Sequence, residues 1–219
     1  MDKQVIALKN ELKRRGIKGI ALDIDETLSW TAGRWTEEMT KRFGNPENLT
    51  TEEILLKYRL VQNYWNNKEA VEWLKKARGN NKLQETLPLI ENSNHFVNKI
   101  NQIVPVACYL TIRPESVMEG TSVWLEKYNF PKAKIIAKPK KIDYSEGSKW
   151  KAKALELLYP EVQGIVDDNW DVIDYLPSTY KGFIFLYRNF YLYTGKLNLI
   201  LCPTWEDVLS EVKEKFTKD

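Results

Sequence analysis

The chain has 219 residues, 43% of them hydrophobic and 12% aromatic, and a formal net charge of +3. This composition is that of a globular protein and excludes a disordered chain. The small charge gives no bulk electrostatic argument for a nucleic-acid partner, and no apolar run approaches the roughly 18–20 residues of a membrane span, so we expect no membrane partner.

The first elements expected along the chain are a short helix and a buried strand. Residues 2–15 carry an apolar stripe at helical spacing that ends at Gly16, which predicts an amphipathic helix. Residues 19–24 form a near-continuous apolar run, typical of a parallel strand covered on both faces. The run leads into Asp23 and Asp25, which point to the same side of an extended segment.

The segment from residue 30 to residue 94 has a different character. Its apolar pattern is helical, Thr50 and Glu53 fit a capping box, and no strong strand pattern interrupts it. We therefore expect a helical cap over residues 30–94, inserted into an α/β core formed by residues 1–29 and 95–219.

Strand and helix patterns alternate over the rest of the chain. Strands are expected at residues 103–110, 135–137, 163–166 and 183–186, and helices at residues 115–128, 149–159 and 205–216. This alternation predicts an α/β fold with a doubly wound, mainly parallel sheet. Thr111 and the pair Asp167–Asp168 follow strands as Asp23 does, so all should lie along one edge of that sheet.

Two carboxylates in one pocket repel each other, and without a cation one of them would become neutral. A hard divalent cation such as Mg²⁺ relieves this repulsion and usually binds together with substrate phosphates. Asp23 and Asp25 therefore favour a magnesium-dependent site that handles a phosphate group.

Cysteine and histidine are scarce, which limits both the compartment and the chemistry. Cys108 and Cys202 provide no disulfide framework, so we expect a reducing, cytoplasmic location. The single histidine, His95, lies in a polar segment and is expected at the surface or at a helix start. A Ser-His-Asp triad would depend on it, and one histidine with two distant cysteines does not make a zinc site.

The run Asp23-Ile24-Asp25-Glu26-Thr27 resembles the first motif, D-x-D-x-T, of the haloacid dehalogenase-like (HAD) superfamily. The other strand ends match the order of that family's four motifs. The resemblance implies a Rossmann-like core, Asp23 as nucleophile and Asp25 as general acid and base. It also makes Thr27 an expected substrate contact.

The second motif of the family is matched by Thr111 and the residues after it. By resemblance, the Thr111 hydroxyl and the Ile112 amide bind a phosphate oxygen. Arg113 is either a ligand of the phosphate or substrate, or simply a surface charge; the sequence leaves both readings open.

The fourth motif is matched by Asp167 and Asp168. By resemblance, the metal ligands are the Asp23 carboxylate, the Asp25 backbone carbonyl and Asp167. Asp168 or Asp171 would complete the outer shell, and helix capping is the alternative role for both.

The third motif is a lysine that neutralises the carboxylate and phosphate charge. Lys151 is favoured because it begins an apolar-periodic helix, Lys149 comes next and is also an expected substrate contact, and Lys138 matches a variant of the family. A nucleic-acid role for the basic run 138–141 is less favoured than a solvated loop.

The expected cap is rich in aromatic residues, which either pack between its helices or line a substrate pocket. Trp30 and Trp35 are the first candidates for stacking on a planar group, because they lie nearest to the first motif.

These features predict a Mg²⁺-dependent phosphomonoester hydrolase that acts through an aspartyl-phosphate on a small soluble ester, near the 5′-nucleotidase branch of the family and so with a nucleoside monophosphate as candidate substrate. A phosphosugar phosphatase or mutase is the nearest alternative. A non-catalytic protein that binds phosphate esters on the same fold is the alternative from another class. The natural substrate, the oligomeric state and the physiological role stay open.

Overall fold

The computed structural model describes residues 2–58, 61–188 and 193–217, which fold around one six-stranded parallel sheet. The order across the sheet is β3-β2-β1-β4-β5-β6. Strands one to three proceed outward in one direction, and β4 then returns to the other side of β1. The strand order therefore switches between β1 and β4, and in such sheets ligands bind at the carboxyl ends of the strands flanking the switch.

The strands are short and most are buried. Their bounds are β1 Gly19–Leu22, β2 Val106–Pro114, β3 Lys134–Lys138, β4 Val162–Asp167, β5 Phe183–Tyr187 and β6 Asn198–Cys202. The four residues of β1 are all buried, as expected for an apolar strand between two helical layers.

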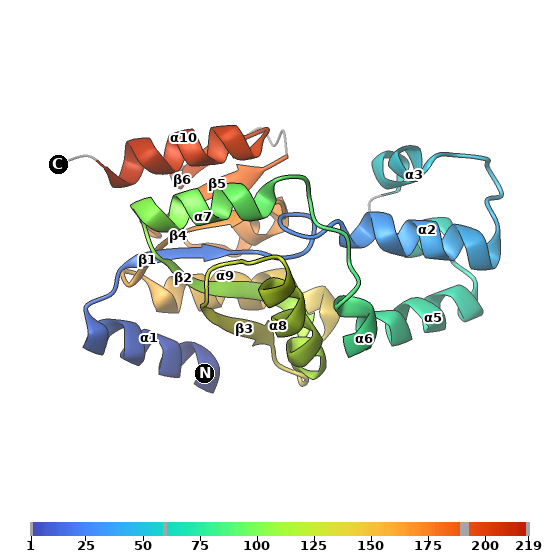
Figure 1. Ribbon diagram of the computed structural model, residues 1–219, viewed down its shortest axis with the longest axis horizontal. Helices are drawn as coiled ribbons and strands as arrows, with labels where there is room; N and C mark the ends of the chain where they lie inside the picture. Colours follow the sequence, from blue (N-terminus) through green and yellow to red (C-terminus); the bar gives the residue numbers. More distant parts are fainter. Residues whose placement is uncertain (1, 59–60, 189–192, 218–219) are drawn as a thin grey trace.

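Helices cover both faces of the sheet, so the core has three layers (Figure 1). One face is covered by α1 Lys3–Arg15 and α9 Gly147–Leu158. The other face is covered by α7 Ser93–Ile103, α8 Met118–Lys127 and α10 Trp205–Phe216. Short 3₁₀ helices occur at η1 Glu115–Val117, η2 Tyr144–Glu146 and η3 Trp170–Tyr175.

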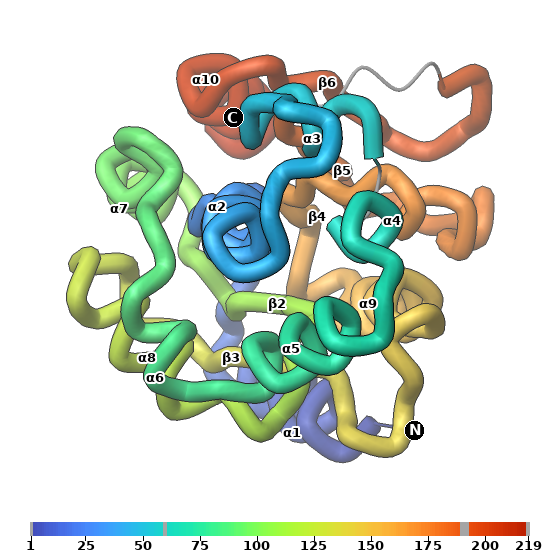
Figure 2. The backbone as a smooth tube through the Cα atoms, turned by 90° about the vertical axis from the view of Figure 1, so that its right-hand side faces the viewer, coloured from blue at the N-terminus to red at the C-terminus, as the bar shows by residue number. Residues whose placement is uncertain are grey.

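Between β1 and α7, the described residues form five helices. These helices lie beyond the carboxyl ends of the strands, at the right of Figure 1 and facing the viewer in Figure 2. They are α2 Thr31–Phe43, α3 Thr51–Lys57, α4 Val61–Tyr64, α5 Lys68–Arg78 and α6 Asn81–Gln84. We call them the α2–α6 segment. The expected capping box of Thr50 and Glu53 is confirmed at the start of α3.

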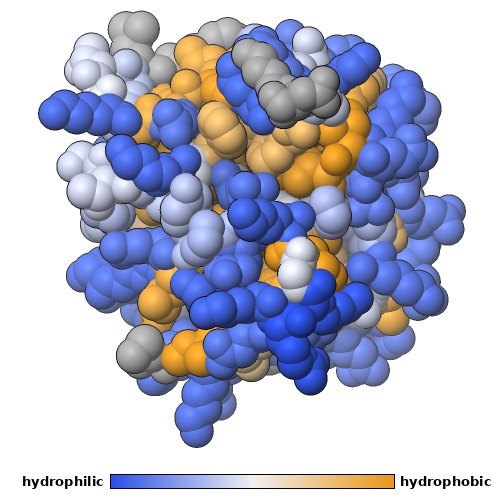
Figure 3. Space-filling view, turned by 90° about the vertical axis from the view of Figure 1, so that its left-hand side faces the viewer, coloured by the Kyte–Doolittle hydropathy of each residue, from blue (hydrophilic) through white to orange (hydrophobic). Residues whose placement is uncertain are grey.

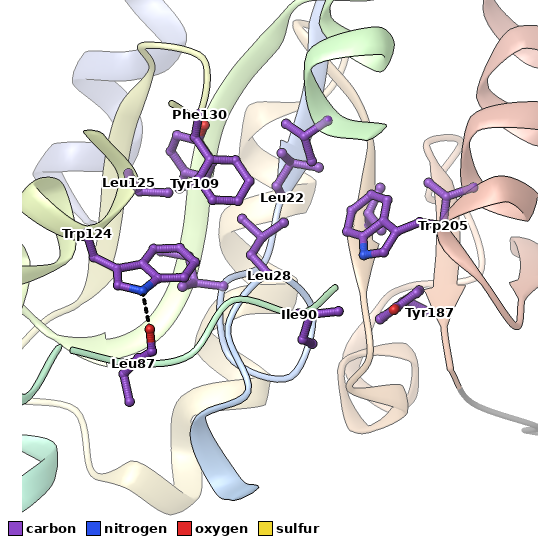
Figure 4. Packing of buried hydrophobic residues seen from close by; sticks show 14 of the residues in the cluster. Leu22, Leu28, Leu87, Ile90, Tyr109, Trp124, Leu125, Phe130, Tyr187 and Trp205 are labelled. Carbon is purple, nitrogen blue, oxygen red and sulfur yellow. Dashed lines mark hydrogen bonds between the residues drawn. The ribbon is translucent and has the colours of Figure 1, made fainter. Parts of the chain in front are cut away.

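The chain enters and leaves the α2–α6 segment through two backbone stretches that lie side by side. The Ile90 amide donates to the Leu28 carbonyl over 2.8 Å, and the Trp30 amide donates to the Pro88 carbonyl over 2.9 Å. The Trp124 indole of α8 also donates to the Leu87 carbonyl over 2.8 Å, as Figure 4 shows. This paired connection, which we call the neck, is therefore anchored to the core.

A close contact between α6 and α8 adds a second attachment. A Cβ on Gly120 would lie 2.2 Å from the Asn81 carbonyl oxygen, so only glycine permits this approach. The Gly120 amide donates to Asn81 Oδ1 over 2.8 Å, and Asn81 Nδ2 donates to the Ser116 carbonyl over 3.1 Å. The last helix of the segment is thus fixed to the core.

The predicted doubly wound, parallel α/β sheet is confirmed, with differences in detail. Helix α7 was not expected; it includes Ile103, where a strand was predicted to begin, and β2 begins at Val106. The edge strand β6 was not expected, although Leu199 to Cys202 form a short apolar run; most of its residues are exposed or half-buried. β2 continues past residue 110 to Pro114, since β3 pairs with both Thr111 and Pro114 across an irregularity in register. His95 is exposed in the first turn of α7, as expected.

The end of the molecule opposite the α2–α6 segment is largely hydrophilic, with smaller hydrophobic patches, as Figure 3 shows. Within the described ranges, no helix has both the length and the apolar character needed to cross a membrane.

Candidate active site

The candidate site lies where β1 and β4 end beside each other. Leu22 pairs with Val166 in the sheet, and the Asp23 amide donates to the Val166 carbonyl over 2.9 Å. This register brings Asp23 next to Asp167, the last residue of β4. Carboxylate oxygens of Asp23, Asp167 and Asp168 lie within 4.8 Å of one another. These three residues form what we call the acidic cluster.

One buried ammonium group lies between two of these carboxylates. Lys151 on α9 places its Nζ 2.5 Å from Asp23 Oδ1 and 2.6 Å from Asp167 Oδ2, and its side chain is only 1% exposed. Burial alone would lower the pKa of Lys151, but the attraction of Asp167 and Asp23 raises it above its usual value. Lys151 is therefore held as a cation.

The acidic cluster carries more negative charge than Lys151 balances. Burial raises the pKa of Asp23 to about 7; Lys151 opposes this shift, and repulsion from Asp167 reinforces it. Burial and the charges of Asp23 and Asp167 also raise the pKa of Asp168. Three carboxylates facing one ammonium leave an excess that a divalent cation would neutralise, and their oxygen atoms suit Mg²⁺.

Neighbouring polar groups fix the orientation of the cluster. The buried Thr27 hydroxyl donates to Asp168 Oδ1 over 3.1 Å and accepts a bond from the Asp168 amide over 3.2 Å. The backbone amide of Asn169 donates to Asp167 Oδ1 over 3.0 Å, and Nδ2 of Asn169 donates to Ser148 Oγ over 3.0 Å. Thr27, expected as a substrate contact, thus orients Asp168 in this structure.

Asp171 lies outside the acidic cluster. Its amide donates to Asn169 Oδ1 over 3.0 Å, and Asn169 is the N-cap of η3. The capping role considered for Asp168 and Asp171 is thus filled by the residue between them.

Asp25 is engaged by a different partner. Nε of Arg113 lies 3.0 and 3.1 Å from the two Asp25 carboxylate oxygens, and Nη2 lies 2.6 Å from Oδ1. Thr31 donates to the same oxygen over 2.6 Å. Burial would raise the pKa of Asp25, but Arg113 and Thr31 hold it below its usual value. Asp25 is therefore ionised, and its carboxylate is not part of the acidic cluster.

Arg113 is 5% exposed, so its interpretation as a surface charge is wrong. Besides Asp25, it donates to Ser29 Oγ over 2.9 Å and to Thr121 Oγ1 over 3.1 Å. The Thr111 hydroxyl, 1% exposed, accepts a bond from the Arg113 amide over 3.2 Å. The end of β2 thus reaches the end of β1 through an extended network of side chains.

The three candidate lysines have separate environments. Lys151 alone among them pairs with the acidic cluster within the described residues. The Lys149 side chain is 45% exposed and pairs with Glu146 at 3.5 Å. Lys138 is buried rather than solvated, and its Nζ donates to the Ile142 carbonyl over 2.6 Å.

Two cavities of about 600 Å³ each adjoin the ends of the strands, and they separate the two tryptophans proposed to stack on a substrate. Trp35 lines the cavity between the α2–α6 segment and the core, which Asp25 and Ile112 also line; we call it the α2–α6 cavity. Trp30 lines the other cavity, beside Trp205. The structure therefore does not bring Trp30 and Trp35 to one pocket.

Several polar residues near the site were not singled out from the sequence. Glu26 has a φ of 58°, its carboxylate accepts the Ala32 amide at the start of α2 over 2.5 Å, and burial raises its pKa to about 7. Because Glu26 lies inside the first motif, its sequence position could have marked it as a residue near the site. Tyr144 and Gln84 line the α2–α6 cavity, and nothing in their sequence context indicated this.

Comparisons with known proteins bear on the fold. No protein-family model and no curated protein matches the sequence. Among solved structures, the chain is similar to one described as "Putative beta-phosphoglucomutase from Bacteroides vulgatus", with a TM-score of 0.50 and 12% sequence identity over 98% of this chain and 98% of that chain. At this identity, the likeness shows that the two chains share a fold.

Proposed function

We propose that this protein is a Mg²⁺-dependent phosphoryl-transfer enzyme of the HAD type that hydrolyses phosphate monoesters. The observation that carries the proposal is the position of Lys151, whose ammonium group lies within 2.6 Å of the Asp23 and Asp167 carboxylates at the switch between β1 and β4. Replacing a buried lysine and its two carboxylates by apolar side chains often costs no stability. Stability alone therefore does not explain why these three charged residues are present. Binding a metal and a phosphate supplies the reason.

Each residue then has a chemical role. An Asp23 oxygen attacks phosphorus, the bond to the leaving oxygen breaks, and an aspartyl-phosphate forms. Water then attacks phosphorus and releases inorganic phosphate and free Asp23. Lys151 and donors at the end of β2, the Thr111 hydroxyl and the Ile112 amide, stabilise the phosphate oxygens. Asp23, Asp167 and Asp168, with the Asp25 backbone carbonyl, would hold Mg²⁺, which supplies further charge stabilisation when bound.

The pairing of Asp25 with Arg113 affects the two half-reactions differently. An ionised Asp25 suits the second step, in which a base accepts a proton from the attacking water. It does not suit the first step, in which an acid donates a proton to the leaving oxygen. We therefore expect fast turnover for esters whose leaving group needs no proton, such as aryl phosphates.

The α2–α6 segment serves in this proposal as the cap, corresponding to residues 30–94 over a core of residues 1–29 and 95–219. Its helices lie beyond the carboxyl ends of the strands, where the acidic cluster lies. Such a cap excludes water from the reacting groups, which strengthens their electrostatic interactions.

The proposal leaves a nucleoside monophosphate, the substrate of the 5′-nucleotidase branch, and a phosphosugar as candidate substrates. The solved structure with the shared fold is described as a phosphosugar enzyme, and that description does not point to nucleotides. Phosphosugar hydrolysis and mutase chemistry share the aspartyl-phosphate and differ in whether water or a second substrate hydroxyl accepts the phosphoryl group.

A direct test uses p-nitrophenyl phosphate with Mg²⁺ and with EDTA. We expect hydrolysis with the metal, loss of activity in EDTA and a loss of at least a thousandfold in Asp23→Asn. Asp174→Asn changes an exposed carboxylate outside the acidic cluster and serves as the matched control. Full activity in Asp23→Asn, or activity that ignores EDTA, would contradict the mechanism. Ester binding without turnover would instead favour a non-catalytic binding protein.

A further inference from the structure

We infer that the substrate carries an apolar leaving group, which binds in the α2–α6 cavity while the phosphate lies at the acidic cluster. This inference rests on the proposed function and specifies its substrate class. The cavity volume of about 600 Å³ is that of a site for a small organic molecule.

The wall contributed by the α2–α6 segment is mainly apolar. Its apolar side chains come from four helices: Trp35, Leu55, Val61, Val71 and Leu74. Val71 is 43% exposed, and Leu55 is half-buried. Apolar surface left open at a cavity gains free energy when an apolar ligand covers it.

Most polar side chains of this wall already interact with neighbouring protein groups. Arg78 Nη2 donates to Gln62 Oε1 over 3.1 Å, and its guanidinium lies 4.5 Å from the centre of the Tyr144 ring. The amide of Gln84 donates to the Arg78 carbonyl over 3.5 Å, and its buried Oε1 has no hydrogen-bond partner among the described residues. Because that oxygen is buried, a ligand in the cavity does not reach it. The exposed Lys75 also lines this wall and offers donors only. Few side chains of this wall are therefore free to accept a hydrogen bond from a ligand.

The small number of free hydrogen-bond acceptors on this wall argues against a sugar as the leaving group. A phosphosugar carries several hydroxyl groups, each of which loses hydrogen bonds to water on binding. A polar group that is buried without a partner costs about 1–3 kcal/mol in mutational measurements, so side chains such as Leu55 and Leu74 disfavour a polyhydroxylated group.

The cavity reaches residues next to the acidic cluster, although the cluster itself does not line it. Asp25, Ile112 and Arg113 line it opposite the apolar wall, and Ile112 is the residue whose amide we assign to the phosphate. Asp25 lies two residues from the nucleophile Asp23. A monoester bound with its phosphate at the acidic cluster thus directs its leaving group into this cavity rather than into the cavity that Trp30 lines.

The test measures binding of n-alkylphosphonates from methyl to octyl by calorimetry with Mg²⁺. Their C–P bond is not hydrolysed, so binding is measured apart from turnover. We expect affinity to rise about fourfold for each added methylene until the cavity is filled. Octylphosphonate should bind at least tenfold more tightly than glucose 6-phosphate or adenosine monophosphate.

Two adjacent leucines provide matched variants. Leu55 lines the cavity, whereas Leu56 is 87% exposed and does not. Leu55→Asn should flatten the dependence of affinity on chain length, and Leu56→Asn should retain it. Equal affinities from methyl to octyl, or tighter binding of the sugar phosphate or the nucleotide, would overturn the inference.

The two proposals fail in different ways. If p-nitrophenyl phosphate is hydrolysed but affinity does not depend on chain length, the apolar leaving group is refuted and the hydrolase proposal stands. If affinity rises with chain length but no ester is hydrolysed, the cavity assignment stands and the proposed catalysis is refuted.

Discussion

Replacing Lys151 by methionine removes the only ammonium group that pairs with the acidic cluster among the described residues. Methionine has a similar length, so the change removes charge and leaves little empty volume. The side chain is 1% exposed, and its Nζ lies 2.5 Å and 2.6 Å from two carboxylates. Removing one partner of such a buried pair typically costs about 3–5 kcal/mol. For a chain of this size, that lowers the melting temperature by roughly 10 °C.

The assay is thermal unfolding at pH 7.5 in EDTA, followed by circular dichroism. Lys149→Met is the control, because this side chain is 45% exposed and its ion pair with Glu146 at 3.5 Å contributes at most about 0.5 kcal/mol. The melting temperature of Lys151→Met should lie closer to that of the wild type at pH 5, where the crowded carboxylates take up protons. Mg²⁺ should raise the melting temperature of this variant more than that of the wild type. Equal melting temperatures for the two variants would refute the reasoning.

Three further outcomes are expected. Arg113→Leu lowers the unfolding free energy by about 3 kcal/mol at pH 7. Because the pKa of Asp25 is lowered in the folded protein, the stability from the Asp25–Arg113 pair is lost as pH falls below about 4. Urea titrations should therefore show the difference in unfolding free energy between variant and wild type closing below that pH. The pKa of Asp23 is raised to about 7, so the metal-free protein loses stability as pH rises from about 4 to 7, and Asp23→Asn should weaken that decline; an unchanged slope rejects this assignment. Gly120→Ala places a methyl group 2.2 Å from a backbone oxygen of α6 and costs about 1–3 kcal/mol, whereas Gly79→Ala meets nothing within 3.7 Å and shifts the urea midpoint little.

The sequence predicts the buried part of this fold well, because strands and helices there have strong hydrophobic patterns. β1 is fully buried, and its apolar run was plain. β6 was missed although Leu199 to Cys202 form an apolar run, and most of this strand is exposed or half-buried at the edge of the sheet. Its pairing with β5 depends on a tertiary contact that no local pattern encodes.

The choice among the candidate lysines shows a second limit. Lys149 and Lys151 are two residues apart, so on a helix they point in directions about 200° apart. Which of them faces the carboxylates depends on how α9 is rotated against the sheet. The structure settles the rotation, because the Lys151 side chain is 1% exposed and the Lys149 side chain is 45% exposed.

The pairing of Asp25 with Arg113 was beyond sequence reasoning for a related reason. The two residues are 88 positions apart, and their contact arises only when β1 and β2 lie side by side. The sequence placed Arg113 at the correct edge of the sheet but not its partner.

The neck has a consequence for how such proteins diversify. Because Leu28 and Trp30 are hydrogen-bonded to Ile90 and Pro88, the chain returns to the sheet almost where it left it. The polypeptide between these points can then lengthen, shrink or be exchanged without shifting the strands that carry the reacting groups. Selection can in this way change which molecules the cavity admits while the residues at the strand ends stay in place.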